Sequence, residues 1–241
     1  MSRKLKAFTM AEVLVTIGII GLLASVLLPS INSNVTKKQF ATALRSISTN
    51  ISDKIQAQMA LEDVGEVGDL KAFVNNTEES GFIKDFSKII NMRPAPEDHV
   101  NIKSIFGNVN DNWSKENVGV MVNGGFLRLQ NYFSAGESAD ISRVQRYGTA
   151  MYRRYATFDI DINGYKKPNL VGRDIFRFDL GQDGTLYPWG GKDESVFRGH
   201  SASRWNGSDS SRLCTNGTPN SISFGYGCAG RIKESNWVMD Y

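Results

Sequence analysis

A run of 21 residues near the N-terminus, from Phe8 to Leu28, holds Glu12 as its only charged side chain. An α-helix rises about 1.5 Å per residue, so a run of this length matches the roughly 30 Å hydrocarbon core of a bilayer. The short leader before it is basic, through Arg3, Lys4 and Lys6. Because positively charged flanks stay on the cytoplasmic side, the sequence predicts a single-pass membrane helix with the rest of the chain outside the cytoplasm.

A secretory signal peptide is the main alternative for this segment. Signal peptides carry a small-residue cleavage site after the apolar run. No such site is evident after Leu28, whereas a small residue, Ala7, stands immediately before Phe8. The order of these features favours a segment that stays attached to the mature chain.

The basic leader, the small residue and the stretch FTMAEVLVTIGIIGLLASVLLP together resemble the prepilin signature of type IV pilins and type II secretion pseudopilins. The resemblance implies cleavage between Ala7 and Phe8 by a prepilin peptidase, followed by methylation of the new N-terminal amine of Phe8. Counted from Phe8, Glu12 is the fifth residue and Pro29 the twenty-second, as in the family pattern. Ala7 departs from the glycine usual in the family, but it is also small, so processing is expected at a reduced rate.

The resemblance also implies a role for Glu12, because a carboxylate inside a membrane is costly and tends to be functional. Glu12 would pair with the N-terminal amine of Phe8 on a neighbouring subunit, which neutralises both charges and sets the axial register of a filament. The alternative is that Glu12 lies at the membrane interface and reaches toward water. Pro29 removes a backbone hydrogen bond and is expected to bend or open the helix near its exit from the lipid.

Beyond the apolar run the helix is expected to continue to Leu61. Apolar residues recur there at spacings of three and four, which places them on one helical face: Phe40, Leu44, Ile47, Ile51, Ile55 and Met59. The predicted fold class is α+β, with a long N-terminal helix, half transmembrane and half amphipathic, packed on an antiparallel β-sheet head as in pilins. The expected segments are a leader 1–7, an assembly helix 8–29, its amphipathic continuation 30–61, a connecting region 62–145 with short helices and a hairpin, and a β-sheet head 146–241.

Three stretches of the head have the pattern of β-strands. VGVMVNGGFLRLQ is typical of a hairpin that turns at Asn123-Gly124. TFDIDING alternates apolar and polar residues, which predicts a strand with one buried face and its acids on the other, and DIFRFDLGQDGTLYP repeats this pattern before Asp183-Gly184. The final segment CAGRIKESNWVMDY is expected to form a closing strand with Trp237 and Met239 on the core side.

The two cysteines, Cys214 and Cys228, would close a 15-residue loop near the C-terminus. Outside the cytoplasm this pair is expected to form a disulfide, which would add roughly 3 kcal/mol by the loop-entropy model. The alternative is two free buried thiols in a cytosolic protein. The resemblance to pilin heads implies that residues 199 to 228 form an exposed loop.

The stretch DIDING matches the first half of an EF-hand loop, with oxygen ligands at alternate positions and a glycine for the turn. The twelfth position, where a bidentate glutamate belongs, is Leu170, so a true EF-hand is not expected. The longer pattern also resembles the heads of many pilin-like proteins, some of which hold calcium in a loop near this end of the chain. The candidate ligands are therefore the oxygen-bearing residues Asp159, Asp161, Asn163 and Asp174. The alternative is a solvated strand face whose acids pair with Arg173 or Arg177.

The charge and the motifs exclude several function classes. Removal of the leader lowers Lys+Arg from 28 to 25 against 25 acids, so the mature chain has no net charge and implies no polyanionic partner. No motif of a hydrolase, a metalloprotease or a nucleotide-binding enzyme is present, so no enzymatic activity is predicted. The segment RVQRYGTAMYRRY interleaves arginine with tyrosine, as nucleic-acid surfaces can, but neutral charge makes such a partner unfavoured.

Two functions follow as expectations. The first is a structural subunit of a type IV pilus or a type II secretion pseudopilus. The length of the chain, together with the family resemblance, favours a minor subunit over a major one. Its partners would be prepilin peptidase, related subunits and the lipid of a bacterial inner membrane, from which it would enter a periplasmic or cell-surface filament. The second is a membrane-anchored, extracytoplasmic binding protein or adhesin, stabilised by calcium. Glu12 distinguishes the two, because only a filament requires it.

Overall fold

The computed structural model describes residues 9–96, 99–104, 109–113, 117–201, 204–205, 214 and 225–241. Within these ranges, nothing is described for the side chains of residues 26, 28–33, 99–104, 109–112 and 143. The chain divides into two compact units, Met1–Gln39 and Phe40–Tyr241. The second unit is called the head below.

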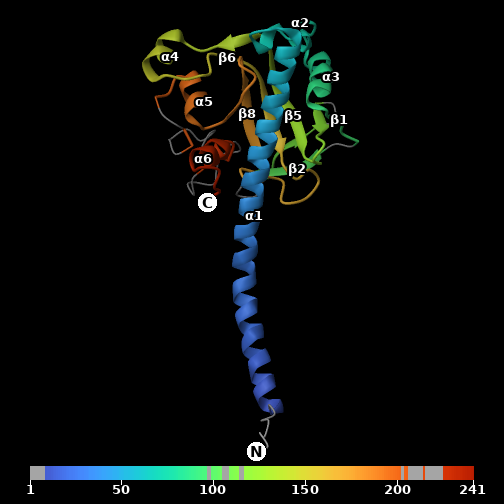
Figure 1. The fold of residues 1–241 in the computed structure, drawn as a ribbon, viewed down its shortest axis with the longest axis vertical. Helices are drawn as coiled ribbons and strands as arrows, with labels where there is room; N and C mark the ends of the chain where they lie inside the picture. Colours follow the sequence, from blue (N-terminus) through green and yellow to red (C-terminus); the bar gives the residue numbers. More distant parts are fainter. Residues whose placement is uncertain are drawn as a thin grey trace, which may run out of the picture. The chain divides into compact units, whose positions relative to one another are not determined.

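The longest element is helix α1, Met10–Glu62, which has 53 residues and contributes to both units (Figure 1). Its backbone remains helical at Pro29, so the helix does not open there in this structure, while the expected bend stays a prediction. Within the head, Leu44, Ile51 and Ile55 are almost fully buried, and the apolar face predicted from their spacing is the one that packs on the core.

Six shorter helices accompany α1 in the described part of the head. Their bounds are η1 (Val67–Asp69), α2 (Lys71–Val74), α3 (Glu79–Ile90), α4 (Ile141–Tyr147), α5 (Lys192–Phe197) and α6 (Cys228–Glu234). The short amphipathic helices predicted after residue 70 are thus present as α2 and α3. Phe82 and Phe86 of α3 are fully buried, which anchors this helix on the core.

The head is built on a mixed sheet of nine strands in the order β1-β4-β5-β6-β8-β7-β2-β3, with β9 paired to β8. The strands are β1 (Arg93–Pro94), β2 (His99–Ser104), β3 (Val109–Trp113), β4 (Val118–Val120), β5 (Phe126–Ser138), β6 (Arg153–Asp161), β7 (Leu170–Val171), β8 (Ile175–Gly181) and β9 (Leu186–Pro188). The α+β class is as predicted, but the sheet is not purely antiparallel. The two-residue strand β7 pairs in parallel with both β2 and β8, whereas β6 and β8 pair antiparallel.

One face of the sheet packs against α1 and α3 (Figure 1). Phe158 and Ile160 of β6 and Phe178 of β8 point to this side and are at most 1% exposed. The ring of Phe158 stacks on Phe86 of α3, with ring centroids 4.9 Å apart. Each such aromatic side chain contributes about 1.5–3 kcal/mol by its burial, so this layer is the main hydrophobic core.

The opposite face of β6 and β8 is polar, as the alternation predicted, but it is not solvated. Asp159, Asp161 and Asp179 are each 0% exposed. Trp189 and Tyr226 cover this side as part of a second apolar cluster, and the Arg177 guanidinium lies 3.7 Å from the centroid of the Tyr226 ring. The expected half-exposed strands are therefore buried on both faces, because segments distant in the sequence cover the side that bears the acids.

The hairpin predicted at Asn123-Gly124 joins β4 to β5, and Gly124 has a positive φ of 84° that suits glycine. The closing strand predicted after Cys228 was wrong, because the described residues from Cys228 to Glu234 form α6 and those that follow contain no strand. Asn236 and Trp237 both have positive φ, 54° and 61°, which turns the chain and is incompatible with an extended strand. Met239 is nevertheless buried, as expected, and is 5% exposed.

Candidate functional site

The N-terminal candidate site begins at Thr9, because Ala7 and Phe8, the two residues of the expected cleavage site, lie outside the described residues. Thr9 immediately precedes α1, and Glu12 lies in its first turn. The backbone N–H and the hydroxyl of Thr9 both donate to Glu12 Oε2 at 2.9 Å, and the Glu12 N–H donates to Thr9 Oγ1 at 3.2 Å. This reciprocal arrangement is a capping box, which provides partners for N–H groups that a helix start leaves unbonded.

Thr9 is a site residue that the sequence interpretation did not include. The signal that could have identified it is the spacing Thr9-x-x-Glu12 immediately before an apolar run, which is the sequence signature of a capping box. The hydrogen bonds have a chemical consequence for Glu12. Because its carboxylate already has partners within its own chain, pairing with an amine of another subunit would exchange these contacts for new ones.

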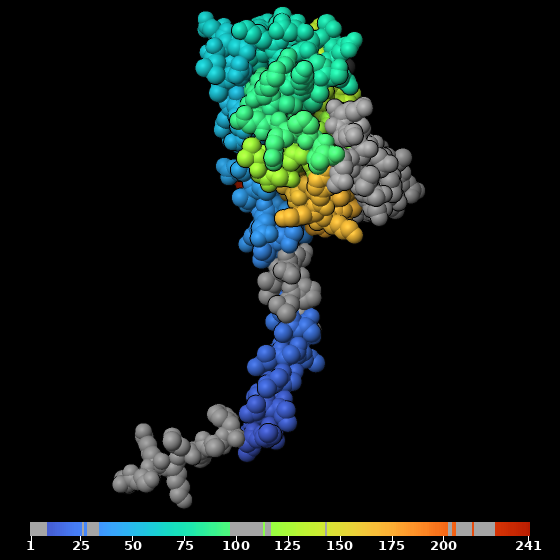
Figure 2. Space-filling view, turned by 90° about the vertical axis from the view of Figure 1, so that its right-hand side faces the viewer, coloured from blue at the N-terminus to red at the C-terminus, as the bar shows by residue number. Residues whose placement is uncertain are grey.

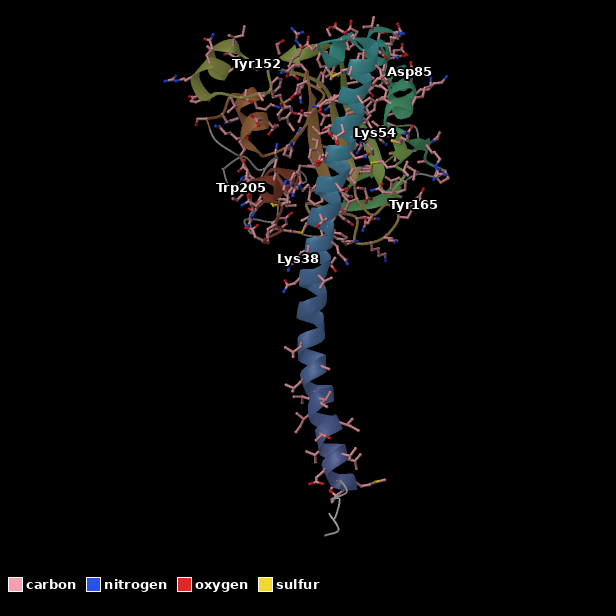
Figure 3. The ribbon with its side chains drawn as sticks, viewed as in Figure 1. Lys38, Lys54, Asp85, Tyr152, Tyr165 and Trp205 are labelled. Atoms are coloured by element: carbon pink, nitrogen blue, oxygen red, sulfur yellow. A yellow bond between two sulfur atoms is a disulfide. The ribbon has the colours of Figure 1, made fainter. Side chains whose placement is uncertain are left out.

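The first unit presents large apolar side chains on the surface of α1 between Met10 and Leu27. Leu14, Ile20 and Leu22 are each more than 60% exposed, and Figure 3 shows the side chains of this part of α1 projecting on several sides of the helix. A Cβ atom built at Gly18 or Gly21 would have no neighbour within 4 Å. Among the helical residues that the structure describes, no segment is both long enough and apolar enough to cross a membrane.

The four candidate calcium ligands are not equivalent. Asp159 pairs with Arg177, which lies directly opposite on β8 and donates from Nε at 2.5 Å and from Nη2 at 2.8 Å. A second arginine, Arg128, has its Nη1 at 3.9 Å from Asp159 Oδ2. The carboxylate of Asp159 is thus committed to two guanidinium groups, as the ion-pair alternative predicted, although the pair is buried rather than solvated.

Asp161, Asn163 and Asp174 lie together at the loop between β6 and β8. Asp161 Oδ1 accepts from the backbone N–H groups of Asn163 and Gly164 at 3.0 and 2.9 Å. Asp174 accepts from the N–H groups of Asn169 and Leu170 at 2.9 and 2.6 Å. The two carboxylates therefore fix the two ends of the same loop.

The electrostatics of this loop reflect two buried acids at close quarters. Burial and then the negative charge of Asp161 raise the pKa of Asp174 to about 6, despite the hydrogen bonds that it accepts. The amide oxygens of Asn163 and Asn169 are buried without a hydrogen-bond partner in the described structure. In the part of the chain that the structure describes, no three His, Cys, Asp or Glu side chains are grouped as a metal site would require.

The disulfide between Cys214 and Cys228 is present, as predicted, and both residues are buried. The Arg231 guanidinium donates to the Cys214 carbonyl at 2.5 Å, which ties the bridge to α6. Most of the loop expected to be exposed, residues 199–228, lies outside the described residues. The bridge thus joins this loop to a helix that packs on the core.

A second ion network, missed by the sequence interpretation, connects β5, β6 and β8 with Arg198, the residue that follows α5. Arg154 Nε donates to Glu137 Oε2 at 2.6 Å, and Arg154 Nη1 lies 3.3 Å from Asp179 Oδ1. Arg198 Nη2 lies 3.8 Å from Asp179 Oδ2. The sequence signal was the recurrence of arginine and aspartate on one side of two adjacent strands, which favours cross-strand pairs.

The arginine-tyrosine segment does not form one exposed surface. Arg154 is 5% exposed and Tyr155 is 3% exposed. Arg153 Nη1 lies 3.3 Å from Glu66 Oε2, so its charge is balanced locally. These three side chains take part in contacts within the head, and the expectation about nucleic acid stays a prediction.

Comparisons of the chain with protein families, with curated proteins and with solved structures found no match.

Proposed function

We propose that this chain is a structural subunit of a helical filament of the type IV pilus or type II secretion pseudopilus kind. In this proposal a prepilin peptidase cleaves it between Ala7 and Phe8, the new N-terminus is methylated, and α1 assembles with related subunits. The single observation that carries the proposal is the N-terminal pattern: a basic leader, a small residue, and an apolar run whose only charge is Glu12. The family resemblance supplies the function, and the physical properties of the segment are consistent with it.

The environment proposed for the first unit is lipid in the precursor and a bundle of neighbouring helices in the filament. A helix that is apolar on all sides is stable only where other apolar groups surround it. Phe8, Val26 and Leu28 belong to the apolar run of the sequence but lie outside the residues whose side chains are described. The leader carries Arg3, Lys4 and Lys6, which supports an inner-membrane orientation with the head outside the cytoplasm.

Glu12 takes two successive partners in this proposal. In the subunit described here its carboxylate accepts from Thr9, so that it is not left without hydrogen bonds in an apolar environment. In the filament it would accept from the charged amine of Phe8 on a neighbour. Thr9 supplies hydrogen bonds but no positive charge, whereas the amine would also neutralise the carboxylate, which lowers the cost of holding this charge in an apolar environment and so favours assembly.

A structural calcium ion in the head remains a proposal, with a smaller set of ligands than the sequence suggested. Asp161, Asn163 and Asp174 offer hard oxygen donors, and the buried, unpartnered amide oxygen of Asn163 fits such a role. Asp159 does not fit, since Arg177 and Arg128 already neutralise it. Calcium at this loop would supply the positive charge that two adjacent carboxylates require.

The proposal is tested by replacement of Glu12 in a cell that contains a prepilin peptidase and a pilin assembly machinery. We expect Glu12→Ala to be inserted and cleaved but to yield at least about tenfold fewer filaments in the sheared fraction. Thr16→Ala is the matched control, because Thr16 lies on the same helix and its hydroxyl donates to the Val13 carbonyl of its own helix rather than to Glu12. Filaments from Glu12→Ala at the level of the unmodified chain would contradict the proposal and favour an anchored binding protein or adhesin.

A further inference from the structure

A cavity of about 480 Å³ lies on the head between α1, the end of α3 and the turn that joins β4 to β5. These three segments meet on the face in Figure 2, where they are coloured blue, green and lime. Buried apolar side chains line it, among them Ile47, Ile51 and Met121, each less than 9% exposed. The volume is within the range of pockets that hold a ligand or side chains of a partner.

Neutral polar side chains and one cation complete the cavity. Asn50, Asn91 and Asn123 contribute amides, and Lys54, labelled in Figure 3, contributes an ammonium group. Lys54 Nζ donates to the Ile90 carbonyl at 2.9 Å, which uses one of its three hydrogens. No acidic side chain occurs among the described residues that line the cavity. The cavity is therefore complementary to an apolar side chain that is followed by a carboxylate.

The same chain exposes such a pair where α1 ends. Leu61 is 80% exposed, and Asp63 is exposed two residues later. The Val64 N–H donates to the Met59 carbonyl at 3.0 Å, which closes the helix with Asp63 in the left-handed conformation at φ 54°. Among the described residues, the Asp63 carboxylate has no hydrogen bond or ion pair.

Asp63 occupies a position that suits glycine. A left-handed conformation is unfavourable for residues with a Cβ atom, and helices that end in this way usually place glycine there. Aspartate is one of the few residues other than glycine that tolerate this conformation, so the fold can keep an acid here. Because the carboxylate is exposed and has no partner among the described residues, it is available for a contact outside the subunit. Leu61, two residues earlier, is also available for such a contact, since its exposed side chain could be buried by another molecule.

We propose that Leu61 and Asp63 of one subunit dock into the cavity of the next, with the Asp63 carboxylate on the Lys54 ammonium and Leu61 on the apolar lining. This inference rests on the proposed filament, because its occupant is a second copy of the chain. The two surfaces lie at different places on the head, so the contact is heterologous. A heterologous contact that does not close into a ring generates a helical polymer. Opposite charges across the contact set its register.

Charge exchange tests the contact in the full chain, in cells that assemble filaments. We expect Lys54→Glu and Asp63→Lys each to lower the sheared filament yield about tenfold, and the double variant to restore it to within about threefold of the unmodified chain. Lys84→Glu and Glu79→Lys are matched controls, since both residues are exposed on α3 away from the cavity lining. Singles that assemble normally, or a double variant no better than the singles, would overturn the inference.

Asp63→Gly separates assembly from folding, in case Lys54→Glu weakens the subunit by loss of its bond to Ile90. Glycine relieves the left-handed conformation, so the subunit should melt at a higher temperature while its filament yield falls several-fold. Normal assembly of Asp63→Gly would also overturn the contact. Absence of filaments from the unmodified chain would instead contradict the filament proposal itself, so the two failures are distinguishable.

Discussion

The carboxylate of Glu12 accepts both the backbone N–H and the hydroxyl of Thr9 at 2.9 Å, so the acid of the apolar segment is engaged within its own chain. The first turn of α1 is thereby held in place immediately after the expected cleavage site. Any function of Glu12 between subunits has to compete with this capping box. The relationship makes Thr9 the residue through which the behaviour of Glu12 can be changed without altering its charge.

Replacement of Thr9 by valine removes the hydroxyl and keeps the shape of the side chain. We expect the first turn of α1 to fray, because the Glu12 N–H loses its acceptor. Amide hydrogen exchange of residues 11 and 12, measured on the full chain in detergent micelles, should become several-fold faster. Thr9→Ser is the control and should exchange as the unmodified chain does. Equal exchange in all three chains would mean that the capping box does not hold the helix start.

The buried pair of Asp159 and Arg177 should matter far more for stability than an exposed pair. Arg177→Met leaves a buried carboxylate with only the more distant Arg128, which should lower the free energy of unfolding by about 3–5 kcal/mol. Lys88→Ala removes an exposed pair with Asp85 and should cost less than about 1 kcal/mol. Urea unfolding followed by tryptophan fluorescence measures both, and comparable losses would contradict the assigned burial.

The elevated pKa of Asp174 predicts a specific dependence of stability on pH. Because the folded value of about 6 exceeds the ordinary value of 3.8, the folded chain binds the proton more tightly than the unfolded chain does. This contribution to stability is present at pH 4, declines as the pH rises toward 6 and is lost above it. The unfolding free energy should fall between pH 4 and 7 by up to about 3 kcal/mol more in the unmodified chain than in Asp174→Asn. Parallel pH profiles would contradict this prediction.

Calcium should restore the stability that the folded chain loses as the pH rises, if it binds the loop between β6 and β8. We expect millimolar calcium at pH 7 to raise the melting temperature of the unmodified chain, because a ligand that binds only the folded state stabilises it. Asp161→Asn and Asp174→Asn should abolish the increase. Asp183→Asn is a control, since Asp183 lies in the turn after β8 and bonds to Thr185 and Tyr187. An unchanged melting temperature of the unmodified chain would contradict the proposed calcium site.

The elements that local spacing determines were predictable from the sequence. The apolar stripe of α1 follows the helical period, and Phe158 and Ile160 follow the strand period, so their buried faces were assigned correctly. The disulfide was predictable from the two cysteines and the expected compartment. In each case the information lies within a short stretch of chain or in residues that have few alternative partners.

The features that depend on segments distant in the sequence were not predictable. The acids of β6 were expected to face water, and they are buried because Trp189 and Tyr226, far along the chain, cover them. The closing strand failed because Asn236 and Trp237 adopt left-handed conformations that their residue types do not demand. Four residues were predicted as calcium ligands, but the register of β6 with β8 places Asp159 directly opposite Arg177, with which it forms an ion pair. Register and coverage depend on long-range pairing, which spacing along the sequence does not encode.

The mass of the N-terminal peptide tests the central proposal most directly. The chain would be expressed with an active prepilin peptidase, and the peptides of the membrane fraction would be read by mass spectrometry. Cleavage by the peptidase should yield a peptide that begins at methylated Phe8. A terminus at Met1 beside an active peptidase, or a terminus beyond Leu28, would contradict it, since the first leaves an uncleaved anchor and the second makes the apolar run a conventional signal peptide.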